Sequence, residues 1–236
     1  MSNDWQTKKL DAVYFVRDGE NEELRYSLRS LAKNLPCRKV WIYGGKPEWA
    51  NLDEFVRIDP DQTTSCYDRV QANLKRVALN PEITEDFILM NDDFFILKRT
   101  EELPPAHRGP LSAHIAKVEA KYGGAPTFFT EQLRQALEAL GPGAKSYELH
   151  IPVILNRQKL LQTLQAHPGI HATRTLYGNQ HGLAGSQIED VKILPPGEFP
   201  KGGQFISSDD STWGPTALTE YIRAEFPEPS KYEKNA

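Results

Sequence analysis

Two adjacent carboxylates, Asp92 and Asp93, interrupt an otherwise apolar stretch of this sequence. The apolar residues Phe87–Met90 precede them and Phe94–Leu97 follow them, and a run of this kind predicts a buried strand. Because an unpaired buried charge is costly, the chain must leave the core here. Paired carboxylates at a strand end suit a hard cation such as Mg²⁺ or Mn²⁺, above all one shared with substrate phosphates. Asn91 and the two carboxylates also favour a turn, so the motif alone leaves a metal site and a structural turn open.

A second pair of carboxylates, Asp209 and Asp210, follows a second apolar run near the end of the sequence. Gln204-Phe205-Ile206 predicts a late strand that reaches this pair. Two acidic pairs at the ends of separate strands favour a site for metal and phosphate more than either pair does alone. The sequence contains no glycine-rich dinucleotide fingerprint, no Walker phosphate loop and no nucleophile elbow.

His150 is the candidate general base, because imidazole titrates near neutral pH and commonly removes a hydroxyl proton. It lies in the segment Glu148–Pro152, where the alternation of an extended chain puts Glu148 on the same side as the histidine. Glu148 could therefore fix the tautomer of the imidazole. A histidine beside a proline is more commonly a structural hydrogen-bonding residue, and this alternative stays open.

Three arginines are candidates for binding an anionic group of a substrate. Arg25 and Arg29 are four residues apart on a predicted helix, so they share a face and could grip a pyrophosphate or a carboxylate. Arg174 stands in a glycine-rich stretch, residues 168–186, which we expect to be a loop that is free to approach a ligand. A solvated surface position is the alternative for all three side chains.

These residues must be held by an α/β fold in which strands and helices alternate. The expected strands of the first half are 12–16, 39–43, 55–58 and 87–90. The expected helices are about 21–35, 67–79, 112–122, 130–140 and 156–166, with a last one from Pro215. The order of the first half predicts a mostly parallel central sheet flanked by helices. In such a sheet, ligands bind at the carboxyl ends of the strands, where Asp92 and Asp93 fall.

The net charge, the apolar stretches and the cysteines of the sequence indicate which partners and which cell compartment to expect. The 236 residues carry a net charge of −4, which argues against a wide nucleic-acid footprint but permits a local basic pocket. The sequence has neither an apolar stretch of roughly 18 residues nor the apolar region of a signal peptide. We therefore expect a cytoplasmic protein without a membrane span. Cys37 and Cys66 are expected to be reduced thiols.

Five segments of the sequence resemble conserved regions of the Stealth family, the sugar-phosphate transferases of capsular polysaccharide synthesis. The segments are Glu23–Leu31 (ELRYSLRSL), Asn91–Phe95 (NDDFF), His150–Pro152 (HIP), Phe205–Asp210 (FISSDD) and Phe226–Glu233 (FPEPSKYE). They occur in the family's order, and the resemblance spans residues 11–233. The chain departs from the family at residues 15–19 (FVRDG), where an additional residue stands before the glycine.

The resemblance implies a single GT-A-like domain over residues 1–236, with a nucleotide-binding half at about 11–98 and an acceptor half at about 111–233. It also implies a nucleotide-sugar transferase with a divalent metal, Mg²⁺ or Mn²⁺. Asp92 and Asp93 would bind the metal, His150 would activate the acceptor, and Arg174 would steady phosphate. The other catalytic candidates are Asp209 and Asp210. The substrate-binding candidates are Arg17, Asp18, Arg25, Arg29, Asn91 and Asn179.

The expected reaction moves a sugar or a sugar 1-phosphate from a nucleotide-sugar donor to an acceptor hydroxyl. The acceptor implied by the resemblance is a glycan; a modified nucleic-acid base stays open, with little support from the acidic composition. Two other functions stay open as well. One is a metal-dependent phosphohydrolase, which also needs clustered carboxylates, and the other is a non-catalytic sugar-binding module that has kept the fold.

Overall fold

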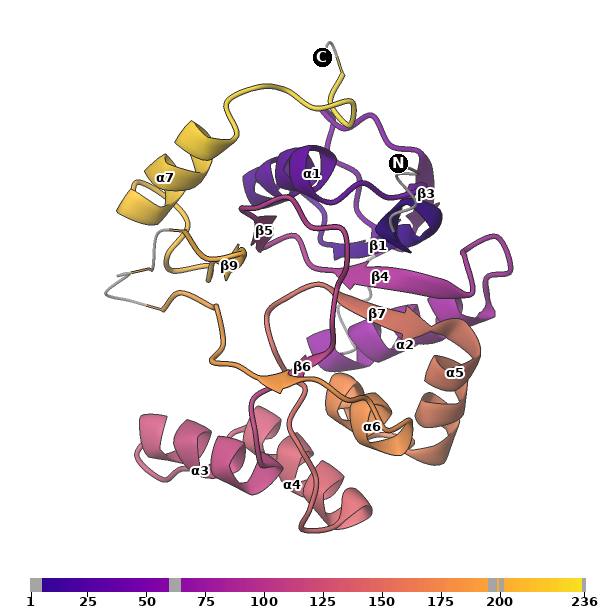
Figure 1. Ribbon diagram of the computed structural model, residues 1–236, viewed down its shortest axis with the longest axis vertical. Coiled ribbons are helices and arrows are strands. Elements are labelled where there is room, and N and C mark those ends of the chain that lie inside the picture. Colours follow the sequence, from indigo (N-terminus) through magenta and orange to yellow (C-terminus); the bar gives the residue numbers. More distant parts are fainter. Residues whose placement is uncertain (1–5, 60–64, 195–198, 200–201, 235–236) are drawn as a thin grey trace.

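A mixed five-stranded sheet forms the centre of the protein in the computed structural model, which describes residues 6–59, 65–194, 199 and 202–234. Its strands are β1 (Asp11–Val16), β2 (Val40–Gly44), β3 (Glu54–Arg57), β4 (Asp86–Met90) and β7 (Val153–Asn156). They lie in the order β3-β2-β1-β4-β7 (Figure 1). The first four are parallel, and β7 is antiparallel to β4.

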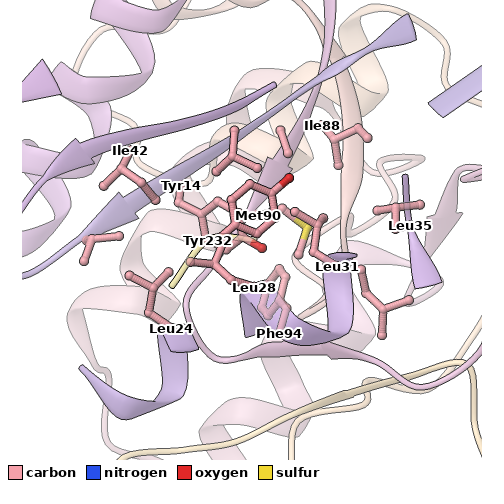
Figure 2. Packing of buried hydrophobic residues seen from close by; sticks show 14 of the residues in the cluster. Tyr14, Leu24, Leu28, Leu31, Leu35, Ile42, Ile88, Met90, Phe94 and Tyr232 are labelled. Atoms are coloured by element: carbon pink, nitrogen blue, oxygen red, sulfur yellow. The ribbon is translucent and has the colours of Figure 1, made fainter. Parts of the chain in front are cut away.

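Helix α1 (Glu22–Asn34) covers one face of the sheet. Asn21 begins it by accepting a hydrogen bond from the backbone N–H of Leu24, which satisfies a donor that the helix itself leaves unpaired. Its apolar stripe packs on side chains that neighbouring strands present in register, among them Tyr14 and Met90 (Figure 2). The stripe consists of the fully buried residues Leu24, Leu28, Leu31 and Leu35.

Helices α2 (Cys66–Leu79) and α5 (Arg157–Ala166) cover the opposite face. Leu74, Val77 and Leu160 are buried there against the strand residues Val13 and Phe87. Because both faces are covered, the inner strands are apolar along their length and do not alternate.

The second half of the chain adds two smaller layers. Helices α3 (Leu111–Lys121), α4 (Phe128–Leu140) and α6 (Thr173–Gln180) share a small core, and α3 and α4 lie at the end of the molecule opposite both termini (Figure 1). Strands β5 (Phe94–Ile96) and β9 (Phe205–Ser207) form an antiparallel ladder that packs with α7 (Ala217–Glu225). The remaining elements are a 3₁₀ turn (Gln6–Lys9) and the short parallel strands β6 (Ala106–His107) and β8 (Ser186–Gln187).

The predicted α/β class with a mostly parallel central sheet is confirmed. The prediction of a loop over residues 168–186 is wrong, because α6 occupies part of it. A Cβ on Gly178 of that helix would collide with the Tyr147 ring, so this glycine permits close packing and does not mark a loop. Cys37 and Cys66 are free thiols. Within the described residues, no helix is both long and apolar enough to cross a membrane.

Candidate active site

The two acidic pairs meet beyond the carboxyl end of β4. The chain turns there through Asp92 and Asp93 into β5, and the antiparallel register places the start of β5 beside the end of β9. At this junction the hydroxyl of Ser207 donates to Oδ2 of Asp93 at 2.9 Å, and Asp209 follows within two residues. We call the carboxylates gathered here the acidic edge: Glu23, Asp92, Asp93, Asp209 and Asp210.

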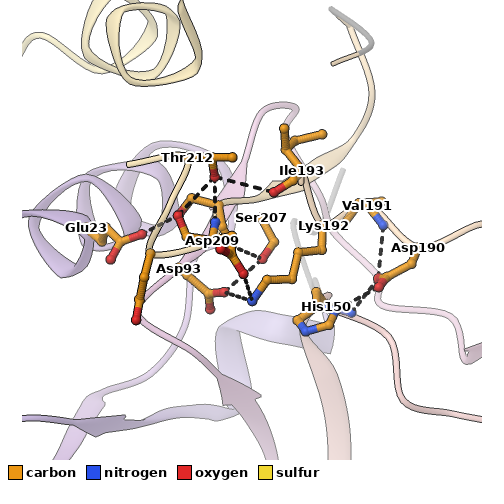
Figure 3. A network of polar contacts seen from close by, with 12 residues as sticks. Glu23, Asp93, His150, Asp190, Val191, Lys192, Ile193, Ser207, Asp209 and Thr212 are labelled. Atoms are coloured by element: carbon orange, nitrogen blue, oxygen red, sulfur yellow. Dashed lines mark hydrogen bonds and ion pairs between the residues drawn. The ribbon is translucent and has the colours of Figure 1, made fainter. Parts of the chain in front are cut away.

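Two cations lie against the acidic edge. Nζ of Lys192 stands between two carboxylates, 3.5 Å from Oδ2 of Asp93 and 3.6 Å from Oδ2 of Asp209 (Figure 3). Arg17 pairs with Asp210 at 3.3 Å on the exposed rim. Arg17 was a predicted site residue, whereas Lys192 lies in a segment whose sequence carries no motif.

Two carboxyls of the acidic edge have raised pKa values. Burial, together with the neighbouring carboxylates, raises the pKa of Glu23 to about 7, although the hydroxyl of Ser208 donates to it at 2.5 Å. Burial and the charge of Asp93 likewise raise the pKa of Asp92, whose Oδ2 accepts a 2.6 Å hydrogen bond from Asn21. Both carboxyls thus lie where burial disfavours the charged form, whereas hydrogen bonds from Ser211 and the charge of Lys192 lower the pKa of Asp209.

The acidic edge fits a divalent cation that completes its coordination on substrate phosphates. Oδ1 of Asp93 is buried without a hydrogen-bond partner among the described residues, and a cation would satisfy it. Among the same residues, no three His, Cys, Asp or Glu side chains stand close enough to enclose an ion by themselves. Mg²⁺ commonly binds one or two carboxylates and the phosphates of a substrate, which is the arrangement that Asp92 and Asp93 suit.

His150 is held by Asp190, a carboxylate that sequence reasoning missed. Oδ2 of Asp190 lies 2.8 Å from Nδ1 of His150, and Oδ1 accepts the backbone N–H of His150 at 2.9 Å (Figure 3). Burial works to raise the pKa of Asp190, but the bonds to His150 and the charge of Arg108 outweigh it and hold that pKa well below its ordinary value. An ionised Asp190 accepts from Nδ1–H, so in the neutral imidazole Nε2 carries the lone pair that can accept a proton.

Glu148 and Arg174 support the histidine segment in ways that the sequence did not indicate. Oε1 of Glu148 accepts the backbone N–H of Thr175 at 3.0 Å, so the expectation that Glu148 orients the imidazole is wrong. Arg174 lies in α6, and its Nη1 donates to the carbonyl oxygens of Leu149 and Ile151 at 2.7 and 2.8 Å. Those carbonyls flank the histidine, so the buried guanidinium fixes the segment that presents it. Burial lowers the pKa of Arg174.

One cavity of about 360 Å³ brings Asp92 of the acidic edge and His150 together. Asn91 and Asp92 line it, as do His150 and Arg174. Part of the remaining wall is aromatic: Tyr67 of α2, Phe129 of α4 and His171 before α6 contribute rings to it. A substrate in this cavity can therefore contact both Asp92, the carboxylate of the acidic edge that faces it, and a proton acceptor.

Four predicted site residues lie elsewhere, and none of them is among the described residues that line the cavity. Arg29 donates to both carboxylate oxygens of Glu233, and Arg25 stacks on Trp49 with its guanidinium carbon 4.8 Å from the ring centre. Asp18 pairs with Arg57 at 2.5 Å. Asn179 exchanges hydrogen bonds with the backbone of Lys145. The substrate-binding role of these four residues stays a prediction.

No protein-family model matches the chain. Over 149 residues the chain is 28% identical to the capsular polysaccharide phosphotransferase fcs1 of Haemophilus influenzae. The match covers 52% of this chain and 40% of that protein. The chain thus spans less than half the length of this curated relative. The predicted resemblance to capsular polysaccharide phosphotransferases is confirmed as a similarity of sequence.

Among solved structures, the galactosyltransferase LgtC in complex with donor and acceptor sugar analogues matches over 95% of this chain and 98% of its own, with a TM-score of 0.50 and 11% identity. The chain has a GT-A-like fold. The apo form of the glycosyltransferase GlyE of Streptococcus pneumoniae matches over 93% of this chain and 60% of its own, with a TM-score of 0.44 and 11% identity. By fold and by sequence, the chain is similar to glycosyltransferases and phosphotransferases.

Proposed function

We propose that the chain transfers a sugar or a sugar 1-phosphate from a nucleotide-sugar donor to an acceptor hydroxyl. The observation that carries the proposal is the placement of His150, which Asp190 holds, and Asp92 of the acidic edge on one cavity. Such a transfer requires a group that takes the acceptor proton and a group that neutralises the departing phosphate. Similarity to fcs1, named as a phosphotransferase, and to LgtC, crystallised with donor and acceptor sugar analogues, supports the same reaction class.

The dyad would act on the acceptor. Nε2 of His150 accepts the proton of the acceptor hydroxyl as the oxygen forms its bond to the donor, and the carboxylate of Asp190 stabilises the imidazolium that results. In sugar transfer the new bond forms at the anomeric carbon, and the nucleotide leaves with the electron pair of the broken C–O bond, as a nucleoside diphosphate from a UDP- or GDP-sugar and as CMP from a CMP-sugar. In sugar-phosphate transfer the new bond forms at phosphorus, and a nucleoside monophosphate leaves.

The acidic edge would hold the donor phosphates through a shared cation. Asp92 and Asp93 would bind a divalent metal, which when present supplies positive charge against the departing phosphate. Lys192 beside Asp93 and Arg17 beside Asp210 offer further positive charge. Arg174 keeps the histidine segment in place, and its charge also favours an anionic donor.

Calorimetry with UDP-, GDP- and CMP-sugars, each with Mn²⁺, tests the proposal. We expect saturable binding of at least one donor, and turnover when a hydroxyl acceptor is added. Binding of none of these donors would contradict the proposal. Turnover that proceeds equally well with water alone would favour the phosphohydrolase. Saturable binding without turnover against any acceptor would favour the sugar-binding module.

A further inference from the structure

The aromatic wall of the cavity has no part in the proposed chemistry. Tyr67 at the start of α2 stands with its ring centre 4.6 Å from that of Phe128 and 6.1 Å from that of His171. Phe128 and His171 are 5.7 Å apart, so the three rings form one contiguous group. We call Tyr67, Phe128 and His171 the aromatic group.

Two members of the aromatic group are open to solvent. Tyr67 is 37% exposed and Phe128 is 48% exposed, although each is a large apolar residue. Phe128 and Phe129 begin α4, and α4 lies well apart from β5 and β9 in Figure 1. Tyr67, His171 and Phe129 line the cavity, and Phe128 contacts Tyr67 beside it.

His171 carries a hydrogen-bonding atom that the protein leaves unused. Its side chain is only 9% exposed, and Nδ1 has no hydrogen-bond partner within the part of the chain that the structure describes. Nε2 lies 3.3 Å from a carboxylate oxygen of Asp68. When Nε2–H donates to that carboxylate, Nδ1 of the neutral ring keeps a lone pair that can accept a ligand hydroxyl. An unsatisfied buried polar atom is costly, and such a ligand would remove the cost.

The chemistry of this wall selects a sugar ring and disfavours phosphate. Aromatic faces carry partial negative charge, which attracts the C–H groups on the face of a pyranose. Asp68 and the Nδ1 atom of His171 are acceptors suited to the hydroxyls on the ring edge. The carboxylate of Asp68 would repel a phosphate placed here.

We propose that the aromatic group is a subsite for an uncharged sugar unit of the acceptor. The inference rests on the proposed transferase function, because His150 on the same cavity defines where the reacting hydroxyl lies. A glycan whose hydroxyl meets Nε2 of His150 would lay a ring against Tyr67 and Phe128. Its donor would occupy the acidic edge.

Titration followed by NMR tests the subsite in the full chain with labelled tyrosine and phenylalanine rings. The probes are uncharged methyl pyranosides and disaccharides, with uridine, guanosine and cytidine as a second set. We expect at least one saccharide to shift the ring signals of Tyr67 and Phe128. Tyr67→Ala and Phe128→Ala should each weaken its binding by about tenfold. Leu79→Ala is the matched control, since Leu79 is an exposed apolar residue at the other end of α2.

Three results would overturn the subsite. Either no saccharide binds, or the aromatic variants bind the saccharide as tightly as the wild type does, or these variants weaken the binding of a nucleoside and not that of the saccharide. The same samples are titrated with the UDP-, GDP- and CMP-sugars and Mn²⁺. Donor binding without saccharide binding removes the subsite alone. Saccharide binding without donor binding removes the transferase proposal and leaves a sugar-binding surface.

Discussion

Two charge clusters lie along α1, and they differ in how completely the protein neutralises them. At one, Glu233 is 9% exposed and accepts hydrogen bonds from Arg29 at 2.7 and 2.8 Å and from the backbone of Ser230. Burial works to raise the pKa of Glu233, but these partners outweigh it and lower that pKa. At the acidic edge, the pKa of Glu23 rises to about 7, and an oxygen of Asp93 is unpartnered among the described residues.

The difference indicates that the cluster around Glu233 is structural, whereas the acidic edge is a candidate ligand site. Arg29 also donates to the carbonyls of Phe226 and Pro227, so its cluster ties the C-terminal segment to α1 and is complete without a ligand. The acidic edge is incomplete, because Oδ1 of Asp93 is buried without a hydrogen-bond partner among the described residues and burial disfavours the charged forms of Glu23 and Asp92. Incomplete neutralisation next to a cavity favours a bound cation and phosphates.

The largest effect is expected for His150→Ala. Loss of a general base should lower the transfer rate by roughly 10²–10⁴-fold, with donor affinity almost unchanged because the base faces the acceptor. Turnover, donor affinity and melting temperature are measured on one preparation. His167→Ala, a histidine outside the described lining of the cavity, is the control. Wild-type turnover in a well-folded His150→Ala protein would remove this residue from the mechanism.

Asp190→Asn should lower the turnover number on the order of 10²-fold while His150 itself stays in place. An amide can donate to Nδ1 and so favours the tautomer in which Nε2 carries the proton and cannot act as a base. The pH–rate profile of the variant is the informative readout. A variant that loses stability but keeps the wild-type rate and profile would show that Asp190 only holds the fold.

The cluster of Arg29 and Glu233 should contribute to the stability of the protein and not to the transfer reaction. Arg29→Ala removes the two-point ion pair of the buried Glu233 and leaves the more distant Arg25 beside it, and we expect a loss of about 3 kcal/mol in the free energy of unfolding. Arg25→Ala, which removes a half-exposed partner 3.8 Å from the same carboxylate, should cost less than about 1 kcal/mol. Urea unfolding gives both values. A large loss of turnover per folded molecule in Arg29→Ala would return Arg29 to the substrate-binding candidates.

Glu23 should make the stability of the protein depend on pH, with a smaller effect than the changes above. Because its pKa rises from 4.5 to about 7 on folding, the native state binds more protons than the unfolded chain between these values. The contribution of Glu23 to stability is therefore fully present below pH 4.5 and is lost as the pH rises through 7. The difference in urea midpoint between wild type and Glu23→Gln, measured from pH 4 to 8, should follow this course. A difference that stays constant over the range would argue against a raised pKa.

The sequence indicated the elements better than the site. The apolar runs before Asp92 and Asp209 located both acidic pairs, and the leucine stripe of α1 located the first helix. Asp190 and Lys192 could not be found, because they lie in a segment without periodicity and reach His150 and Asp93 only through the tertiary fold. The structural role of Arg29 was hidden for the same reason, since its partner lies 204 residues away.

The central claim is that the acidic edge binds a divalent cation together with donor phosphates. Electron paramagnetic resonance of Mn²⁺, titrated with UDP, GDP or CDP into wild type and Asp93→Asn, tests it most directly. The account predicts that a nucleotide raises the affinity of the wild type for Mn²⁺ and that Asp93→Asn loses this binding while its melting temperature changes little. Equal Mn²⁺ binding by the two proteins, or none by either, would contradict the account and leave Asp92 and Asp93 as a structural turn.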